Sequence, residues 1–523
     1  MRPARLVAVL ALAVLGATGG AVEAGSRPAD GAVGPIVAED FPATANDYQR
    51  PVASNSPVIA VDPTDARFVA LAHRVDAPEF GCGLQVSGDG GRGFVPARPV
   101  PHLPEGADRC YAPEVAFGPD GTFYYLFVGL AGGGNVPMGV FLTTSTDRAR
   151  RFSAPRRVLG PHSFAVRMAV DPGVGQQGRI HLVWLAASAE PPLGSMPSPP
   201  NPLLAAHSDD GGRTFSTPVQ VSDRSRQRVV APALALGADH SVHVLYYDLG
   251  DDARDYQGLE GPTWEGTWSL VLATSPDRGR RFGRGTVVDD GVVPPERVML
   301  IFTMPPPALA IDGQGRLFAA WHDARNGDWD VFMRRSSEGG WRWSEPLRLN
   351  DDPVGNGRHQ YQPRLAVAPG GRVDAVFYDR RDDPDNVRNH VVHTFSTDAG
   401  QRFSPNRTLA SRASDSRIGQ RYAGPAAEGL VEFGSRLGLV SDDRRAIAAW
   451  TDTRNAQRPA QQDVFATVVA FPPPAPSAAT EPAGRASRSW LAVAAGAIAA
   501  PSLVVLSLRR RRARNRSAKV PEP

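Results

Sequence analysis

Ser208-Asp-Asp210-Gly-Gly212-Arg-Thr-Phe215 belongs to a pattern, Ser-x-Asp-x-Gly-x-x-aromatic, that occurs six times in the chain with small departures. The other copies begin at Ser87, Ser145, Ser275, Ser336 and Ser396 and end at Phe94, Phe152, Phe282, Trp343 and Phe403. Successive first serines are 58, 63, 67, 61 and 60 residues apart. Copies at such regular spacing indicate one structural repeat rather than several unrelated domains.

The chemistry of the pattern is that of a tight turn. Ser and Asp oxygens accept hydrogen bonds from turn N–H groups, Gly adopts positive φ, and the aromatic side chain packs beneath the turn. The pattern resembles the Asp box of the BNR repeat found in the sialidase superfamily. That resemblance implies a β-propeller in which the boxes are folding devices.

A first short strand recurs seven times, which is one more than the boxes. The copies are residues 57–61, 113–117, 166–170, 232–236, 307–311, 363–367 and 436–440. Most are followed by a turn, a second strand, a third strand that leads into the box, and a fourth strand after it. This order predicts four-stranded antiparallel blades.

The seventh unit stops after its third strand, near Ala470. Its missing fourth strand can come from the other end of the chain, because Pro35-Ile-Val-Ala-Glu-Asp40 matches fourth strands such as Pro346-Leu-Arg-Leu-Asn-Asp351. Such pairing would also remove an exposed sheet edge. We therefore predict an all-β, seven-bladed propeller from Gly34 to Phe471. A six-bladed ring of the sialidase type, with a misassigned terminal unit, is the alternative.

Both ends of the chain carry targeting or anchoring signals. Residues 1–24 have two arginines, an apolar run and a small-residue cleavage pattern, which is typical of a signal peptide. Residues 25–471 form the predicted propeller, and residues 472–488 form a stalk rich in Pro, Ala and Ser. Residues 489–508 predict a transmembrane helix, and the basic residues 509–523 predict a cytoplasmic tail. The expected location is the cell membrane, with a single span and the propeller outside.

The charge of the chain is divided unevenly. The whole chain carries +3; removing +1 for residues 1–24 and +6 for residues 489–523 leaves −4 on the exported part. A mildly acidic ectodomain argues against nucleic-acid binding, which uses clustered basic surface. The only lysine is Lys519, so no Schiff-base or phosphate-loop lysine can exist in the first 518 residues. Cys82 and Cys110 both lie in the exported part, and we expect a disulfide between them.

The resemblance to bacterial sialidases is strongest in the first unit, where Ala72-His-Arg74-Val-Asp76-Ala-Pro78 precedes the first box. It implies that Arg74 binds substrate and that Asp76 is the acid/base. The family nucleophile is a Tyr on a late blade, for which Tyr422 is the candidate, with Glu428 as its partner. This sequence departs from the family at Asn55, which stands where the first carboxylate-binding arginine of the family stands.

A second set of candidates repeats at equivalent positions. It comprises Trp321-His-Asp323-Ala-Arg325, Phe377-Tyr-Asp379-Arg-Arg381 and Trp450-Thr-Asp452-Thr-Arg454. Repetition favours a scaffold in which Asp and Arg pair to hold the rim. The functional interpretation makes Arg325, Arg381 and Arg454 a cluster that binds carboxylate or sulfate groups of a substrate.

Other chemistry finds little support. The turn at Asp382, Asp383, Asp385 and Asn386 matches no defined calcium loop, and the histidines lack zinc spacing, so we expect no metal or other cofactor. Two hypotheses from different classes remain. One is an exo-α-sialidase-like glycoside hydrolase at the cell surface, and the other is a non-catalytic propeller that binds glycan or protein with the same rim. We expect a monomeric ectodomain in either case.

Overall fold

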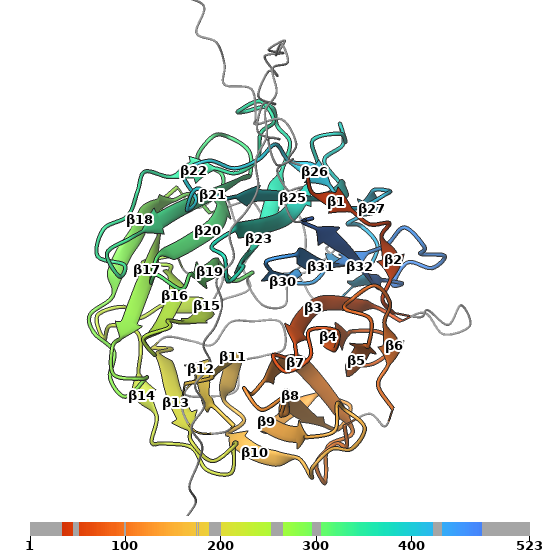
Figure 1. Ribbon diagram of the computed structural model, residues 1–523, viewed down its shortest axis with the longest axis vertical. Helices are drawn as coiled ribbons and strands as arrows, with labels where there is room; N and C mark the ends of the chain where they lie inside the picture. The colour runs from red at the N-terminus through yellow and green to blue at the C-terminus, as the bar shows by residue number, and fades with distance from the viewer. Residues whose placement is uncertain are drawn as a thin grey trace, which may run out of the picture. The chain divides into compact units, whose positions relative to one another are not determined.

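Seven antiparallel sheets follow one another around a common axis, and each provides one blade of a propeller (Figure 1). The computed structural model describes residues 34–44, 52–98, 101–173, 175, 177–187, 200–252, 265–294, 305–421 and 431–472. The predicted signal peptide, transmembrane helix and tail, and the stalk beyond its first residue, lie outside these ranges. Within the described ranges, no helix has the length and apolar character needed to span a bilayer.

The first four blades use consecutive strands. Blade 1 has β3 (Ser54–Val61), β4 (Val69–Val75), β5 (Gly81–Ser87) and β6 (Val95–Pro96); blade 2 has β7 (Arg109–Phe117), β8 (Phe123–Ala131), β9 (Val136–Ser145) and β10 (Arg156–Leu159). Blade 3 has β11 (Ser163–Asp171), β12 (Arg179–Ala186), β13 (Leu203–Ser208) and β14 (Val219–Gln220); blade 4 has β15 (Val229–Leu236), β16 (Val242–Asp248), β17 (Trp268–Ser275) and β18 (Thr286–Val292). The first strand of each blade lies nearest the axis (Figure 1).

The remaining blades complete the ring. Blade 5 has β19 (Ala308–Ile311), β20 (Leu317–Asp323), β21 (Asp330–Ser336) and β22 (Leu347–Arg348); blade 6 has β23 (Gln360–Val367), β24 (Val373–Asp379), β25 (Arg388–Ser396) and β26 (Arg407–Thr408), with β27 (Ser414–Asp415) also paired to β25. Blade 7 has β30 (Gly438–Asp442), β31 (Arg445–Asp452) and β32 (Asp463–Ala470). A separate hairpin of β28 (Gln420–Arg421) and β29 (Val431–Glu432) precedes blade 7.

The N-terminal segment supplies the fourth strand of blade 7. In β1 (Ile36–Val37), Ile36 pairs with Ala470 and Val37 with Val469, and β2 (Phe41–Pro42) extends the pairing along β32. The predicted closure and the predicted count of seven blades are therefore confirmed. The closure covers the edge of β32, which would otherwise present unpaired backbone groups.

The Asp boxes form the expected turns. In the first box, Ser87 Oγ accepts a hydrogen bond from Gly91 N (2.9 Å), and Asp89 Oδ1 accepts from Arg92 N (2.9 Å) and Gly93 N (3.1 Å). The fifth position of each box has positive φ, which runs from 60° at Ala149 to 90° at Gly340. The boxes thus join the third and fourth strands, as the local chemistry predicts.

The last aromatic residue of each box packs against the preceding blade. Phe94 contacts a cluster shared by blades 1 and 7, and Phe152 contacts one shared by blades 1 and 2. The same relation holds for Phe215, Phe282, Trp343 and Phe403. Blade 7 has no box, and Phe471 packs between blades 6 and 7 in its place, with its ring centroid 5.2 Å from that of Phe395. Burial of one large aromatic side chain in each seam stabilises the ring.

Replacement of a box glycine tests this packing. Gly91 has a φ of +85°, and a Cβ on it would lie 2.8 Å from Ile447 Cδ1 of blade 7. We expect Gly91→Ala to lower the free energy of unfolding by about 1–3 kcal/mol, because the turn is left-handed and the seam is close-packed. Gly88→Ala is the matched control in the same box, since a Cβ there meets no atom within 4 Å. Equal denaturation midpoints for the two variants would contradict the proposed packing.

The two cysteines form the predicted disulfide. Cys82 on β5 and Cys110 on β7 are bonded, with their Cα atoms 5.7 Å apart. The bond links blade 1 to blade 2, and it closes a loop between residues that are 28 positions apart. Disulfides that close loops of this size contribute roughly 3 kcal/mol to stability.

Buried histidines make the fold sensitive to acid. Burial lowers the pKa of five histidines to about 4: His73, His181, His243, His322 and His359. An unfolded histidine titrates near pH 6.5, so the unfolded chain binds more protons than the folded chain between about pH 6.5 and 4. Stability should therefore fall as the pH falls through this window.

Urea denaturation between pH 7.5 and 4.5 tests the histidine effect. Each buried histidine should contribute a slope of up to about 1.4 kcal/mol per pH unit within the window. His322→Gln should reduce the slope by the contribution of one histidine, up to about 1.4 kcal/mol per pH unit. A free energy of unfolding that is constant from pH 6.5 to 4.5 would refute the prediction.

Candidate functional site

Arg74 and Asp76 lie together at the end of β4. Arg74 Nε lies 2.7 Å from Asp76 Oδ1, and Arg74 Nη2 donates to Asp76 Oδ2 at 2.8 Å. Their side chains are 3% and 0% exposed, so the ion pair is almost completely removed from solvent. Among the described residues, this ion pair therefore lies in the protein interior.

A second carboxylate, which the sequence did not suggest, completes the pairing of Arg74. Glu432 of β29 accepts a hydrogen bond from Arg74 Nη2 at 2.6 Å, although the two residues are 358 positions apart. Tyr111 of β7 accepts from Arg74 Nη1 at 2.8 Å. Burial opposes the charge of Arg74, but Asp76, Tyr111 and Glu432 raise its pKa well above the usual value. The guanidinium is thus a permanent cation held by two carboxylates.

Amide side chains extend the network to blade 7. Asn55 lies opposite Arg74 in the register of β3 and β4, and its Nδ2 donates to Asp76 Oδ2 (2.8 Å) and Gln462 Oε1 (3.1 Å). Gln462 Nε2 donates to the carbonyl of Glu432 at 2.8 Å. Asn55 thus fills the place of the family's first arginine with a neutral residue that is already bonded. We call Asn55, Arg74, Asp76, Glu432 and Gln462 the clasp, since they join the first and last blades.

The candidate nucleophile cannot be placed against this network. Tyr422 and Glu428 lie outside the described residues, between β28 and β29. Glu432 follows shortly after these two residues in the sequence. Its only sequence signal is that it is the single carboxylate in Leu430-Val-Glu-Phe-Gly434. The assignments of Asp76 and Tyr422 to catalysis remain predictions.

The three rim arginines each bind two carboxylates. Arg325 Nη2 lies 2.6 Å from Asp323 and 3.0 Å from Asp289 of blade 4. The matching contacts of Arg381 are to Asp379 (2.7 Å) and Asp351 (2.5 Å), and those of Arg454 are to Asp452 and Asp40, both at 2.6 Å. Burial raises the pKa of Asp323. Burial acts to lower the pKa of the three arginines, but their bonds to carboxylates outweigh it and raise the pKa of each.

These contacts agree with the scaffold interpretation of the repeated motif. Each Asp also accepts a hydrogen bond from the backbone N of the Arg two residues later, at 3.0 Å for Arg325 and 2.8 Å for Arg381 and Arg454. The Asp–Arg unit therefore fixes the loop after the second strand and ties it to the end of a fourth strand. A substrate carboxylate would have to displace an existing pair, so the proposed substrate-binding role of these arginines gains no support from their contacts.

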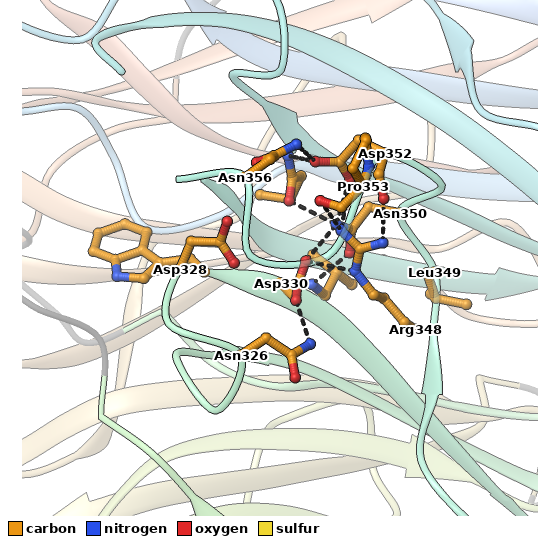
Figure 2. Close-up of polar contacts among 12 residues, drawn as sticks. Asn326, Asp328, Asp330, Arg348, Leu349, Asn350, Asp352, Pro353 and Asn356 are labelled. Carbon is orange, nitrogen blue, oxygen red and sulfur yellow. Dashed lines mark hydrogen bonds and ion pairs between the residues drawn. The ribbon is translucent and has the colours of Figure 1, made fainter. Parts of the chain in front are cut away.

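A further polar cluster lies at the junction of blades 5 and 6 (Figure 2). Asp330 Oδ1 accepts hydrogen bonds from Arg348 Nε and Asn350 Nδ2, both at 2.6 Å, and Asp352 Oδ1 accepts from the same two side chains. Asp328 Oδ2 accepts from Gly357 N at 2.7 Å, while its buried Oδ1 has no partner. Burial, together with Asp330 and Asp352, raises the pKa of Asp328.

The cluster is not arranged as a metal site. Among the described residues, no group of three or more potential ligands could hold a metal ion. The predicted turn at Asp383 is likewise occupied by backbone, because Asp383 Oδ2 accepts from Val387 N and Arg388 N, both at 2.7 Å. In the sequence, the feature that could have indicated the cluster in Figure 2 is the pair of closely spaced aspartates in Asn326-Gly-Asp328-Trp-Asp330.

Comparison with known proteins agrees with the repeat. Residues 202–424 match the family model described as a BNR repeat-like domain. Over these residues the chain is similar to that family. The match contains the boxes that begin at Ser208, Ser275, Ser336 and Ser396, and the boxes that begin at Ser87 and Ser145 lie outside it.

Solved structures similar to this propeller have diverse descriptions. A Dyadobacter fermentans protein of unknown function is 14% identical, with 84% of this chain and 100% of that chain covered and a TM-score of 0.43. A Hadza microbial sialidase is 13% identical, with 78% and 75% covered and a TM-score of 0.42. An ulvan lyase from a new polysaccharide lyase family is 12% identical, with 81% and 95% covered and a TM-score of 0.48. No curated protein matches the chain.

Proposed function

We propose that this propeller is exported, anchored in the membrane by residues 489–508, and binds extracellular glycans without hydrolysing them. The clasp carries the proposal. Asp76, the candidate acid, is fully buried and bound to Arg74 and Asn55, and Arg74 is bound to two carboxylates. A general acid must exchange protons with a substrate, and a substrate-binding arginine must have donors to offer, so neither group is poised for catalysis.

The glycan ligand is inferred from the repeat. The Asp boxes resemble those of the sialidase superfamily, and the BNR match covers four of them. The rim opposite the boxes carries the loops between the second and third strands, where the side chains of Arg325 and Arg381 are 21% and 27% exposed. Loops on a rigid ring are the usual place for a binding site.

Turnover of a sialoside is the test that separates binding from hydrolysis. Purified residues 25–488 should release no fluorophore from a fluorogenic sialoside above the rate of the Asp76→Asn variant, and should bind one or more glycans on an array. Hydrolysis by the wild type that is lost in Asp76→Asn would overturn the non-catalytic proposal. Absence of binding to every glycan would overturn the glycan ligand.

The membrane anchor is tested separately. We expect the full chain to sediment with membranes, and a chain that ends at residue 488 to appear in the soluble extracellular fraction. Recovery of the full chain in the soluble fraction would contradict the anchor.

A further inference from the structure

The inner strands place charged side chains at one level around the axis. One residue in the first strand of each blade occupies the same position, because it pairs with an equivalent residue of the second strand. These seven residues are Val58, Glu114, Arg167, Ala233, Ala308, Arg364 and Gly438. Blades 1, 4, 5 and 7 thus contribute small or apolar side chains, whereas blades 2, 3 and 6 contribute one carboxylate and two guanidinium groups. The charges are concentrated on part of the ring.

A β-bulge precedes each of the charged residues. The register shifts between Tyr111 and Glu114, between Phe164 and Arg167, and between Tyr361 and Arg364. Each bulge holds a residue other than glycine at positive φ: Ala112 at 49°, Ala165 at 49° and Gln362 at 54°. The same bulge precedes the uncharged Val58 and Ala233, with Ser56 and Ala231 at positive φ, so it is a feature of the repeat that sets the direction of the side chains that follow.

Glu114 is the centre of the charged group. It lies 3.1 Å from Arg167 Nη1 of blade 3, and it also bonds to Arg436 of blade 7. Arg436 Nη2 donates to the carbonyl of Pro113 (2.8 Å), and Arg167 Nε donates to that of Pro232 (3.1 Å). These two guanidinium groups are therefore oriented by the backbone of other blades. We call Glu114, Arg167, Arg364 and Arg436 the axial cluster.

Arg364 has a charge but no bonded partner within the described residues. Its guanidinium makes none of the hydrogen bonds or ion pairs found there, and its Nε is buried without an acceptor. Burial lowers the pKa of Arg364, and repulsion from Arg436 adds to the effect while Glu114 opposes it. Burial and the same kind of repulsion lower the pKa of Arg167 to about 10. Three guanidinium groups thus share one carboxylate, which leaves an excess of two positive charges.

We propose that the axial cluster binds an oxyanion, namely a carboxylate or sulfate group, with Arg364 as its principal contact. The inference deepens the proposed glycan binding by assigning the ligand an acidic group. A planar guanidinium offers two parallel N–H donors, which match the oxygens of a carboxylate or sulfate. Arg364 is partly buried, and a cation that is partly removed from water without a counter-ion costs free energy, which a bound anion reduces.

The composition of the axial level favours an anion over a neutral sugar or a cation. Val58, Ala233, Ala308 and Gly438 add no charge and little volume, so the side chains at these four positions do not compete for the guanidinium donors. The side chains of Arg167, Glu114 and Arg436 are 15%, 8% and 12% exposed, so the cluster keeps some access to solvent. Excess positive charge in such a low-dielectric setting attracts anions strongly.

Calorimetric titration of residues 25–488 with sodium sulfate and with sodium glucuronate, at constant ionic strength, tests the proposal. We expect saturable binding of at least one anion, and none of glucose. Arg364→Gln should weaken that binding by about tenfold or more, since it removes a charged fork, and Arg364→Lys should weaken it less. Arg342→Gln is the matched control, because Arg342 is an arginine 84% exposed on the box rim and should leave affinity unchanged.

The melting temperature without added anion provides a second, independent measurement. Arg364→Gln removes a partly buried charge that has no counter-ion bonded to it among the described residues, so it should raise the melting temperature, whereas loss of a purely structural arginine would lower it. Sulfate strengthens apolar burial in any protein, so only saturation and the difference between variants count as binding. The result that overturns the proposal is no saturable binding of either anion, or equal affinity for the wild type and Arg364→Gln.

The two anions distinguish the source of the oxyanion. Binding of sulfate alone indicates a sulfate ester, and binding of glucuronate alone indicates a uronic or other sugar acid. If both anions bind but no glycan on the array does, the axial site stands and the proposed glycan function fails. If glycans bind, neither anion binds, and Arg364→Gln leaves glycan binding unchanged, the axial site is refuted and the proposed glycan binding is retained.

Discussion

Deletion of residues 34–44 is expected to open the ring and abolish cooperative unfolding of the propeller. In the described part of the chain, these residues cover the edge of β32 that faces away from β31, with pairing from Ile36–Ala470 to Pro42–Phe465. Their loss exposes the edge of a strand whose side chains are almost all buried. The expected loss is on the order of the whole free energy of unfolding of a globular domain, about 5–15 kcal/mol.

The same segment also joins blade 7 to its neighbours through side chains. Asp40 lies 2.6 Å from Arg454 and accepts a hydrogen bond from Ser411 N of blade 6, and Phe41 stacks on Phe94 of blade 1 at 6.3 Å between centroids. Deletion therefore removes contacts on both sides of the closing blade. We expect aggregation in size-exclusion chromatography and loss of a sharp thermal transition.

A permuted chain is the control for the deletion. It begins at residue 52 and carries residues 34–44 after Phe471 through a short turn, so that β32 and β1 form a hairpin like the β21–β22 pair of blade 5. Because the covering strand is restored, the permuted chain should melt close to the wild type. A deleted chain that melts as sharply as the permuted one would show that the strand does not close the ring.

The closure was predictable from sequence because it depends on local signals. The boxes, the first strands and the match of residues 35–40 to other fourth strands are short patterns that repeat at fixed spacing. Repetition also located Arg325, Arg381 and Arg454, since equivalent loops occupy equivalent positions. The pairing of Cys82 with Cys110 followed from the presence of only two cysteines, both in the part of the chain that the sequence predicts to be exported.

The clasp and the axial cluster were not predictable in the same way. Glu432 reaches Arg74 only because the ring brings the last blade against the first, and no local pattern marks a contact across 358 residues. Arg364 resembles any polar residue in a short strand, and its direction depends on the bulge after Tyr361. Sites built where blades converge depend on closure, so they follow from the tertiary structure rather than from the repeat.

Replacement of Arg74 by methionine is expected to lower the free energy of unfolding by about 3–5 kcal/mol at pH 7.5. The substitution keeps an apolar chain of similar length but leaves Asp76 and Glu432, both with fully buried side chains, without their shared cation. Arg67→Met is the matched control, since Arg67 pairs with Asp65 at 76% exposure and should leave stability nearly unchanged. Urea denaturation of both variants and the wild type measures the difference.

The pH dependence of that difference identifies its cause. Without Arg74, the two buried carboxylates favour the protonated form, so the folded variant binds more protons than its unfolded chain at mildly acid pH. The stability lost on substitution should therefore shrink as the pH falls from 7.5 towards 5. Comparison with the wild type at each pH cancels the opposite effect of the buried histidines, which destabilises both proteins in acid. A penalty that stays constant with pH would mean that lost packing, rather than unpaired carboxylates, accounts for the effect, and the clasp would then not hold the blades by charge.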